Sequence, residues 1–374
     1  MVASELREGE ASCLDRALEL AELGRGQVSP NPLVGAVLVR DGRVIGEGHH
    51  AKLGELHAER NALRDCAERG EDPAGATMHV TLEPCGHQGR QPPCADALLE
   101  AGVTRVVIAS EDPSEKGSGR GPGALRDGGV EVVWASGPQA SAARLLNQAF
   151  RKHARSGRPL VTLKVALSLD GRVATPDESR WLSGPESRAL VHEWRADTDA
   201  IAVGIGTALA DDPLLTARGS GELRQPLRVV FDSQARLPVT SALLGTLNVS
   251  PVICVVSPDA PRDRLDALRE RGAELIYADG STGAERVTGA LTELGRREVT
   301  SVFLEGGPTL AKAFMSAGEV DEARFFYAPL LVGGGTPAPA RSEPGPVAEA
   351  SRALAATSRV VGPDVLITAR MREW

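Results

Sequence analysis

The sequence has few cysteines, no long apolar run and no excess of basic charge, and each of these absences excludes a class of protein. Its five cysteines form an odd, scattered set, which argues against a disulfide framework and favours metal binding or burial. Without a run of about 18 apolar residues, no membrane-spanning helix is expected. A formal net charge of −8 argues against a polynucleotide substrate, because nucleic-acid binders usually carry a basic surface.

The first residues, MVASELREGEASCLDRALELAELG, are acidic and lack the basic-then-apolar order of a signal peptide. We therefore expect a cytoplasmic protein. At 374 residues, two domains are the default expectation. The composition, 42% hydrophobic and 25% charged, is ordinary for a globular protein.

Hydrophobic periodicity in the first 150 residues predicts alternating helices and strands. Residues 36–48 are expected to form a hairpin with Asp41-Gly42 at its turn. Helices are predicted over 12–24, 56–70, 94–102 and 121–129. Strands are predicted over 76–84, 103–110 and 130–136. This alternation predicts an α/β domain with a largely parallel sheet.

The stretch RKHARSGRP, residues 151–159, is basic and has no apolar period, which predicts a linker between a domain at 1–150 and a second at 160–374. A second alternating series follows, and it predicts another α/β domain. Its strands are expected over 160–167, 200–206, 227–232, 250–257, 273–278, 301–307 and 323–335. The Gly/Pro-rich segment 333–346 is expected to be a surface loop.

Four residues in the first half have the spacing of a catalytic zinc site. His57 and Glu59 stand at the start of a predicted helix, and Cys85 and Cys94, each preceded by proline, are separated by eight residues. One imidazole and two thiolates bind zinc well, and three protein ligands leave a fourth position for water. We expect both cysteines near a helix start, where backbone N–H groups favour the thiolate. Glu59 can then take a proton from water and return it to a leaving amine, as in zinc deaminases.

Other interpretations of these residues stay open. Cysteines that follow prolines are also compatible with buried small side chains. A structural zinc site would need a fourth ligand, for which His87 is the candidate, and it would leave Glu59 without a role. His49 and His50 follow the hairpin and either line the pocket or belong to an ordinary loop, which is the interpretation we favour for His49. The remaining cysteines have no matching partners, so burial is expected for Cys13, Cys66 and Cys254.

A glycine-rich turn in the second half is a candidate phosphate site. The sequence LEGGPTLAKAF predicts a strand end, a Gly-Gly-Pro turn and a helix start, where backbone N–H groups bind phosphate. Such a turn is a weak signal by itself, and without G-x-G-x-x-G it does not support a Rossmann fold. Asp170-Gly171 is compatible with a simple turn or with a role in an active site.

The motifs of both halves together resemble a known family. PNPLVGAVLVRDGRVIGEGHHAKLGELHAERNAL and VTLEPCGHQGRQPPCADALLEAG resemble the deaminase domain of the bifunctional riboflavin biosynthesis enzymes. LKVALSLDGRVA, ESRWLSG, GIGTALADDPLLTAR, LRVVFDS and LEGGPTLAKAF resemble their reductase domain, in that order. The resemblance runs from about residue 12 to the C-terminus. It implies a cytidine-deaminase-like three-layer domain followed by a dihydrofolate-reductase-like domain.

The resemblance also implies the chemistry and the roles of individual residues. Such enzymes hydrolyse the 2-amino group from a diaminopyrimidine ribosyl 5'-phosphate and then reduce the ribosyl chain with NADPH. The deaminase positions are the zinc ligands His57, Cys85 and Cys94, the proton shuttle Glu59 and the pocket residue Asn31. The NADPH positions are Ala166, Trp181, Thr207, Asp211, Ser233, Gly307, Pro308, Thr309, Leu310, Ala311, Lys312 and Ala313. The substrate positions of the reductase are Ser179, Arg195, Leu215, Arg218 and Glu305.

Three features depart from the family pattern. Gln91 replaces a threonine before Pro92, and Ser114 replaces an asparagine after Asp112-Pro113. The segment ATPDESRW is one residue shorter than the family leads us to expect. The first two departures concern the deaminase pocket, and the third concerns the cofactor contacts near Trp181.

Three other functions are alternatives to that of a bifunctional riboflavin biosynthesis enzyme. One is a single-activity homologue in which one half has drifted to another nucleotide-like substrate. A nucleic-acid base editor is disfavoured by the acidic charge. A non-enzymatic zinc module would unfold when its metal is removed. The partner expected is thus a small molecule, not nucleic acid or membrane, and the resemblance suggests a homodimer through the reductase domain.

Overall fold

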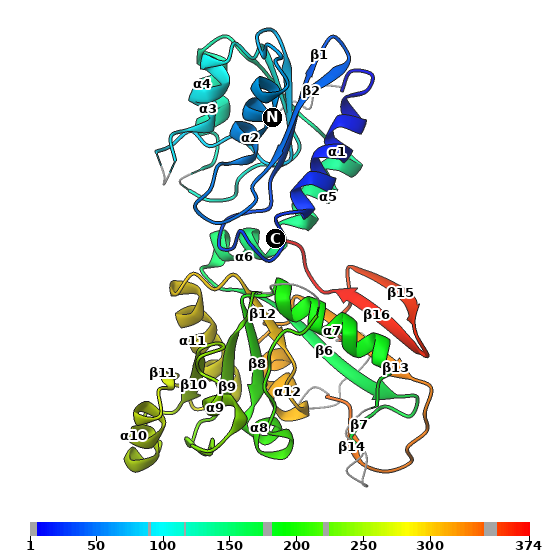
Figure 1. The fold of residues 1–374 in the computed structure, drawn as a ribbon. Helices are drawn as coiled ribbons and strands as arrows, with labels where there is room; N and C mark the ends of the chain where they lie inside the picture. Colours follow the sequence, from blue (N-terminus) through cyan, green and yellow to red (C-terminus); the bar gives the residue numbers. More distant parts are fainter. Residues whose placement is uncertain (1–5, 89–90, 116, 175–181, 220–223, 340–349) are drawn as a thin grey trace. The chain divides into compact units, whose positions relative to one another are not determined.

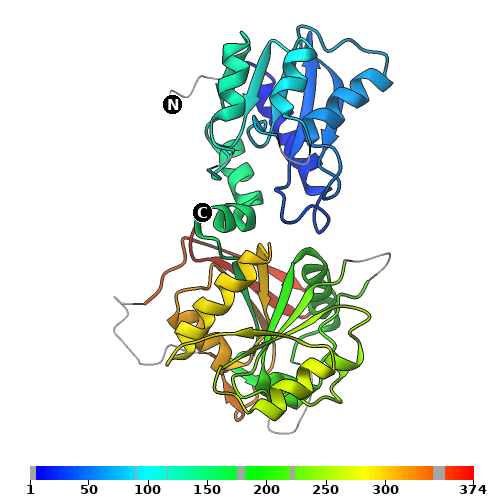
Figure 2. The same cartoon turned by 90° about the vertical axis from the view of Figure 1, so that its left-hand side faces the viewer.

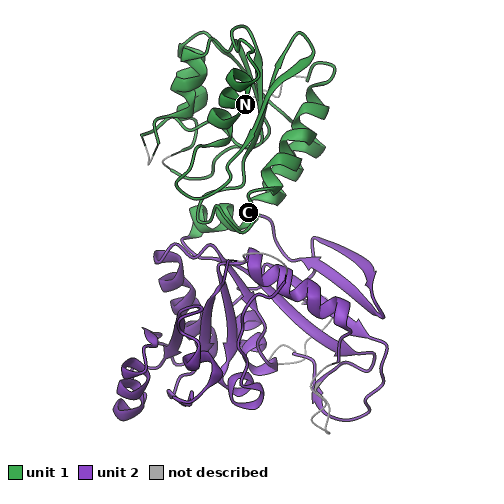
Figure 3. Cartoon of the chain, viewed as in Figure 1, with its two compact units in different colours: residues 1–156, 374 green, residues 157–373 purple. Residues whose placement is uncertain are grey.

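The computed structural model describes residues 6–88, 91–115, 117–174, 182–219, 224–339 and 350–374. The chain divides into two compact units, residues 1–156 with Trp374 and residues 157–373 (Figure 3). No helix within the described ranges is long and apolar enough to cross a membrane.

Unit 1 contains a five-stranded sheet with the order β2-β1-β3-β4-β5. Its strands are β1 (Gly35–Arg40), β2 (Arg43–His49), β3 (Thr77–Val80), β4 (Arg105–Ile108) and β5 (Glu131–Trp134). The hairpin turn at Asp41-Gly42 is confirmed, and both of its residues have left-handed φ angles, 53° and 75°. The expectation of a largely parallel sheet is wrong for this unit. β1 pairs antiparallel with both β2 and β3, because the hairpin places β1 inside the sheet, and only β3-β4 and β4-β5 are parallel.

Helices cover both faces of this sheet and make three layers (Figure 1). The helices are α1 (Glu10–Glu22), α2 (Ala58–Glu68), α3 (Cys94–Glu100), α4 (Arg120–Asp127), α5 (Pro138–Leu146) and α6 (Gln148–Ser156). Apolar side chains of α2, α3 and α4 pack against one face. Those of α1 and α5 pack against the other. The three-layer arrangement expected for the first domain is confirmed.

Unit 2 contains a nine-stranded sheet with the order β11-β10-β9-β8-β12-β6-β13-β16-β15. The strands are β6 (Leu160–Ser168), β8 (Ala200–Gly204), β9 (Leu227–Phe231), β10 (Val252–Val256), β11 (Glu274–Tyr277), β12 (Ser301–Leu304), β13 (Glu322–Ala328), β15 (Ala355–Val361) and β16 (Asp364–Arg370). The strands from β11 to β13 are parallel, and β16 and β15 add antiparallel strands at one end. Two short strands, β7 (Arg172–Ala174) and β14 (Thr336–Pro337), pair separately.

The helices of unit 2 also lie on both faces of its sheet, as Figure 2 shows. They are α7 (Pro185–Asp197), α8 (Ile205–Asp211), α9 (Ala242–Gly245), α10 (Arg262–Glu270), α11 (Gly283–Arg296) and α12 (Pro308–Ser316). Side chains of α11 and α12 pack on one face, and those of α7, α8, α9 and α10 pack on the other. Because β6, β8, β9 and β12 run in parallel, their carboxyl ends meet at one edge of the sheet, where ligands bind in open α/β sheets.

The structure differs from the sequence expectations at the border between the units. The division falls between Ser156 and Gly157, inside the expected linker, but residues 151–156 are helical and belong to α6. This helix has no apolar period because the side chains that it buries are charged, Arg151 and Lys152. Arg151 donates to the Ser110 hydroxyl and pairs with Glu111, and these partners replace apolar packing.

The expected loop at 333–346 is partly described. Thr336–Pro337 form the short strand β14, and residues 340–346 lie outside the described ranges. The Asp170-Gly171 pair forms a turn, in which Gly171 has a φ of 75°. The Asp170 carboxylate accepts hydrogen bonds from the backbone N–H groups of Val332 and Gly333, which hold its pKa well below the usual range.

Candidate active sites

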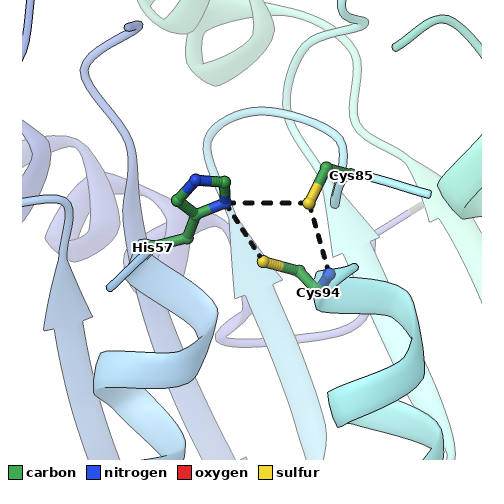
Figure 4. A group of neighbouring side chains, drawn as sticks. All are labelled: His57, Cys85 and Cys94. Carbon is green, nitrogen blue, oxygen red and sulfur yellow. Dashed lines mark hydrogen bonds between the residues drawn. The ribbon is translucent and has the colours of Figure 1, made fainter. Parts of the chain in front are cut away.

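His57, Cys85 and Cys94 come together in unit 1 with their donor atoms facing one another (Figure 4). The Nδ1 atom of His57 lies 3.4 Å from Sγ of Cys94 and 3.7 Å from Sγ of Cys85. His57 is the N-cap of α2, Cys94 is the first residue of α3, and Cys85 lies in the loop after β3. Three segments that are separated in sequence therefore supply one donor atom each.

The separations suit zinc. Bonds of roughly 2.0 Å to nitrogen and 2.3 Å to sulfur in a tetrahedral arrangement place such donors about 3.5 to 3.8 Å apart. All three donor atoms lie within 4.8 Å of one another, and His87 is not part of this group among the described residues. The structural-zinc hypothesis, which required His87, therefore gains no support. Three donors leave a coordination position for water, as in catalytic sites.

The expectation that both cysteines lie near a helix start holds only for Cys94. Cys85 is in a loop, but the backbone N–H of Cys94 at the start of α3 donates to its sulfur over 3.2 Å. Hydrogen bonding with the Cys94 side chain is the main cause that lowers the pKa of Cys85, to about 4, and the bond with His57 acts in the same direction. These contacts favour the thiolate form of Cys85, which is the form that binds metal.

Glu59 is the second residue of α2, beside the metal-donor group, and is 3% exposed. Burial, together with the charge of the Cys85 thiolate, raises the pKa of Glu59 to about 7. A carboxyl group with a pKa near neutral pH can both accept and donate a proton under physiological conditions. The arrangement therefore suits a proton shuttle.

Two further polar residues adjoin the metal-donor group. The Nδ2 atom of Asn31 lies 3.1 Å from Nε2 of His50. The His50 ring stands edge-on to the His57 ring, with 5.4 Å between their centroids, and it is 2% exposed. His50, whose role the sequence left open, is therefore next to the site, whereas His49 is a half-buried residue at the end of β2 whose carbonyl accepts a hydrogen bond from Asn61.

Gln91 and Ser114, the two residues of this unit that depart from the family pattern, both form hydrogen bonds. The side-chain amide of Gln91 donates to the Gly54 carbonyl over 3.3 Å. The backbone N–H of Ser114 donates to the Asp112 carboxylate, and the Ser114 hydroxyl accepts from the N–H of Gly117. The serine therefore stabilises the loop after β4, and glutamine links the cysteine-bearing loop to the segment before His57.

Of the other cysteines, Cys66 and Cys254 are buried, as expected, and Cys13 is only half-buried.

In unit 2, the Gly-Gly-Pro turn connects β12 to α12 at the carboxyl edge of the parallel sheet. Gly307 is the N-cap of α12, and no side chain caps the helix there. The N–H of Gly307 donates to the Thr207 hydroxyl on α8 over 3.2 Å, which brings two of the expected cofactor residues together. A Cβ on Gly306 would lie 2.9 Å from the Cδ2 atom of Leu310, so a larger residue would require that side chain to shift. An uncapped helix start after a glycine turn fits the phosphate groups of a dinucleotide.

Arg195 and Glu305, both expected to bind substrate, pair with each other in this structure. Nε and Nη2 of Arg195 lie 2.6 and 3.0 Å from the two Glu305 oxygens, and Nη1 donates to the Thr216 carbonyl. Burial opposes the ionised form of Glu305, but the charge and hydrogen bonds of Arg195, together with the charge of Lys164, outweigh burial and lower the pKa of the carboxyl group. The two side chains therefore form one preorganised unit.

Lys164 on β6 was missed in the sequence. Burial lowers its pKa, while the Glu305 carboxylate opposes that change, so the amine acts on the same ion pair. A charged residue in the middle of the apolar run LVTLKVAL is a signal that could have identified it, because lysine is rarely buried without a partner.

The remaining expected residues of unit 2 differ in exposure. Ala166 on β6 and Ser233 after β9 are half-buried, Leu215 is buried, and Asp211 and Arg218 are exposed. Within the α12 segment, Ala311 is buried, Thr309 is exposed, and Pro308, Leu310, Lys312 and Ala313 are half-buried. Ser179, Trp181 and most of the shortened ATPDESRW segment lie outside the described residues.

Comparison with known proteins matches each half to a family. Residues 8–110 match the cytidine and deoxycytidylate deaminase zinc-binding region, and residues 159–367 match the RibD C-terminal domain. The riboflavin biosynthesis protein RibD of Escherichia coli is 41% identical over 85% of this chain and 87% of its own length. RibD of Actinobacillus pleuropneumoniae is 40% identical, covering 85% of this chain and 83% of its own. The chain belongs to the RibD family.

Solved structures agree with this membership. The diaminohydroxyphosphoribosylaminopyrimidine deaminase/5-amino-6-(5-phosphoribosylamino)uracil reductase of Thermotoga maritima superposes with a TM-score of 0.85 at 34% identity, covering 97% of this chain and 99% of its own. Acinetobacter baumannii RibD gives a TM-score of 0.85 at 35% identity, with the same coverage. As a RibD protein, this chain is a bifunctional riboflavin biosynthesis enzyme with a zinc-binding deaminase domain and an NADPH-dependent reductase domain. Nothing in these matches supports the single-activity alternative, because both RibD domains are found.

Proposed function

We propose that unit 1 deaminates a diaminopyrimidine ribosyl 5'-phosphate and that unit 2 reduces the ribosyl chain of the product to ribityl. The observation that carries this proposal is the group of His57, Cys85 and Cys94 beside the buried Glu59. The Thermotoga maritima relative supports it, since its name describes both activities on such compounds.

In the deaminase, His57 and the two cysteines are proposed to hold zinc, which when bound lowers the pKa of a water molecule. Glu59 would accept a proton from the attacking water and donate it to the leaving amine, a role that its burial beside the metal-donor group suits. Asn31, held by His50, is proposed to contact the pyrimidine ring.

In the reductase, NADPH supplies the hydride. The start of α12, from Gly307 to Ala313, is proposed to bind its pyrophosphate, with Thr207 fixing the turn through the Gly307 N–H. Ala166, Trp181, Asp211 and Ser233 are proposed as further cofactor contacts. The substrate is proposed to contact Ser179, Leu215, Arg218 and the Arg195–Glu305 pair, where guanidinium groups suit phosphate and the carboxylate suits sugar hydroxyls.

We also propose that the protein works in the cytoplasm as a homodimer formed through the reductase domain. Its five cysteines are not joined in disulfides, and the cytoplasm keeps cysteines reduced. β15 lies at the end of its sheet, and its Val360 is 74% exposed. An edge strand with exposed apolar side chains is a ready site for strand pairing.

The experiment that tests the catalytic proposal compares Glu59→Gln with wild type. Ammonia release from the diaminopyrimidine substrate and NADPH oxidation with the deaminated intermediate are measured separately, with zinc content determined for each protein. We expect Glu59→Gln to keep zinc, to lose ammonia release by about 100-fold or more, and to oxidise NADPH normally. Glu83→Gln is the matched control, because Glu83 is also buried with its pKa raised to about 7, but it accepts from the backbone N–H of Gly119.

The outcomes separate the parts of the proposal. If wild type releases no ammonia from this substrate, the deaminase acts on a different compound. If Glu59→Gln retains ammonia release, Glu59 is not the proton shuttle. Equal losses in Glu59→Gln and Glu83→Gln would show that any change to a buried carboxylate in this unit disturbs the site.

A further inference from the structure

The loop between α8 and β9 contains a residue with a strained backbone. Leu215 has a φ of 52°, in the left-handed region that a non-glycine residue with a bulky side chain rarely adopts. Asp212, at the C-cap of α8, also has a positive φ of 40°. Such conformations persist only where the surroundings hold them, and they occur preferentially at functional sites.

Side chains from other elements bind the carbonyl oxygens of Leu214 and Thr216, the residues on either side of Leu215. Nη1 of Arg228, on β9, donates to the Leu214 carbonyl over 3.3 Å. On the other side, Nδ1 of His192 and Nη1 of Arg195, both on α7, donate to the Thr216 carbonyl over 3.2 and 3.1 Å. The carbonyl groups of Leu214 and Thr216, the two neighbours of Leu215, are therefore both fixed.

The next residue of the loop, Ala217, is held by a single side chain. The Oε1 atom of Gln225 accepts from the Ala217 N–H over 3.0 Å, and its Nε2 donates to the Ala217 carbonyl over 3.2 Å. Ala217 immediately precedes Arg218, so this pair of bonds sets the backbone from which the Arg218 side chain extends.

Arg228 is fully buried, and its hydrogen bonds go to the protein backbone and one hydroxyl. Besides Leu214, it donates to the hydroxyl and the carbonyl of Thr246 and to the carbonyl of Ser250. Burial lowers the pKa of this guanidinium to about 10. Burying an arginine is costly unless its donors are used. Here Nη1 and Nη2 are used, and they connect the Leu215 loop to the segment after α9, whereas Nε has no hydrogen-bond partner among the described residues.

From these contacts we infer that Arg228, Gln225 and His192 are positioning residues of the reductase, which hold Leu215 and Arg218 in the geometry that receives the substrate. This inference rests on the proposed function, in which Leu215 and Arg218 contact the substrate. None of the three residues needs to contact the substrate itself. They act through the backbone of residues 214–217. Burial lowers the pKa of the His192 imidazole, and the charge of Arg218 is near enough to lower it further.

The test uses Gln225→Leu and Arg228→Met in the full-length protein, with Arg228→Lys as the conservative variant. Steady-state kinetics of the reductase give kcat and the KM values for the deaminated intermediate and for NADPH. Ammonia release, measured in the same preparations, shows whether the deaminase activity of unit 1 is unchanged. Arg271→Met is the matched control, because the Nε of Arg271 also donates to a backbone carbonyl, that of Val239, but at an exposed position at the end of α10.

We expect kcat/KM for the intermediate to fall about tenfold to 100-fold in Gln225→Leu and Arg228→Met, mainly through KM, since misplacing a binding group by about 1 Å can have such an effect. KM for NADPH should change less than about twofold, which a general loss of structure would not produce. Arg228→Lys should recover part of the loss, and Arg271→Met should resemble wild type. If folded Gln225→Leu keeps the wild-type KM for the intermediate, the inference is wrong. Gln225→Leu tests the positioning role even if Arg228→Met does not fold.

Hydrogen exchange of the peptide that covers residues 212–218 provides a readout that does not depend on the substrate. Loss of the Gln225 bonds should accelerate exchange of the Ala217 amide about tenfold or more. If wild type does not reduce the proposed intermediate, the proposed function fails while the exchange result still tests the positioning role. Unchanged exchange in Gln225→Leu would overturn that role directly.

Discussion

The buried side chain of His79 should make unit 1 less stable to unfolding at acid pH. It lies on β3 directly opposite Val37 of β1, on the face of the sheet that packs against α1, and it is 2% exposed. Burial lowers the pKa of His79 from 6.5 to about 4, and the nearby Arg105 charge acts in the same direction while Glu10 opposes it. The folded protein therefore keeps this imidazole neutral at pH values where the unfolded chain binds a proton.

The size of the effect follows from the difference between the two pKa values. Because the folded-state pKa is the lower one, the unfolded state binds more protons, and stability is lost as the pH falls from about 6.5 towards 4. A difference of about 2.5 pKa units is worth about 3 kcal/mol, at 1.36 kcal/mol for each unit. Above pH 7 the effect vanishes, since the imidazole is neutral in both states.

The measurement compares wild type with His79→Leu, an apolar replacement that cannot bind a proton. Hydrogen exchange of the β3 amides, corrected for the intrinsic rates, gives the free energy of opening of unit 1 at pH 7.5 and at pH 4. We expect wild type to lose about 3 kcal/mol more than the variant between these pH values. Equal losses in the two proteins would refute the argument, because the other titrating groups of the unit are present in both.

Three further predictions concern the two active sites and the assembly. Glu305→Gln removes the charged partner of Arg195. It should lower kcat/KM of the reductase about tenfold or more without changing ammonia release. An unchanged kcat/KM would show that the Arg195–Glu305 ion pair does not hold the substrate site in its active geometry. Zinc chelation should stop ammonia release while NADPH oxidation with the deaminated intermediate continues, and a parallel loss of both activities would contradict independent sites. Light scattering should give the mass of a dimer for wild type and a smaller mass for Val360→Lys, which adds a charge to the exposed edge strand; a monomeric wild type would exclude the homodimer.

The sequence by itself determined the features that depend on neighbouring residues. The His-x-Glu pattern at the start of a helix, the Pro93-Cys94 pair and the Gly-Gly-Pro turn are local, and the structure has the expected helix start at each. The Pro84-Cys85 pair is the exception, because Cys85 lies in a loop. Apolar patterns also located the strands of the first sheet and those of the second from β6 to β13, because side chains in a strand point alternately to its two faces. The sequence analysis did not predict β15 and β16. The family resemblance then gave these local patterns their order and their chemistry.

Periodicity failed where charged side chains are buried. Residues 151–156 carry no apolar stripe, yet they are helical, because Arg151 and Lys152 are buried with polar and aromatic partners from other segments. At Lys164 periodicity did locate the strand, but the interaction of this lysine with Glu305 was not predicted. Burial of a charge depends on partners that are distant in sequence, and no local pattern records them.

Only the tertiary structure decided how the functional residues act on one another. It brought Arg195 and Glu305 together across 110 positions, and Gly307 and Thr207 across 100. It also placed Arg228, Gln225 and His192 around the strained Leu215. The physical reason is that the parallel sheet brings strand ends from distant parts of the chain to one edge, where hydrogen-bond partners are set by strand order and not by position in the sequence.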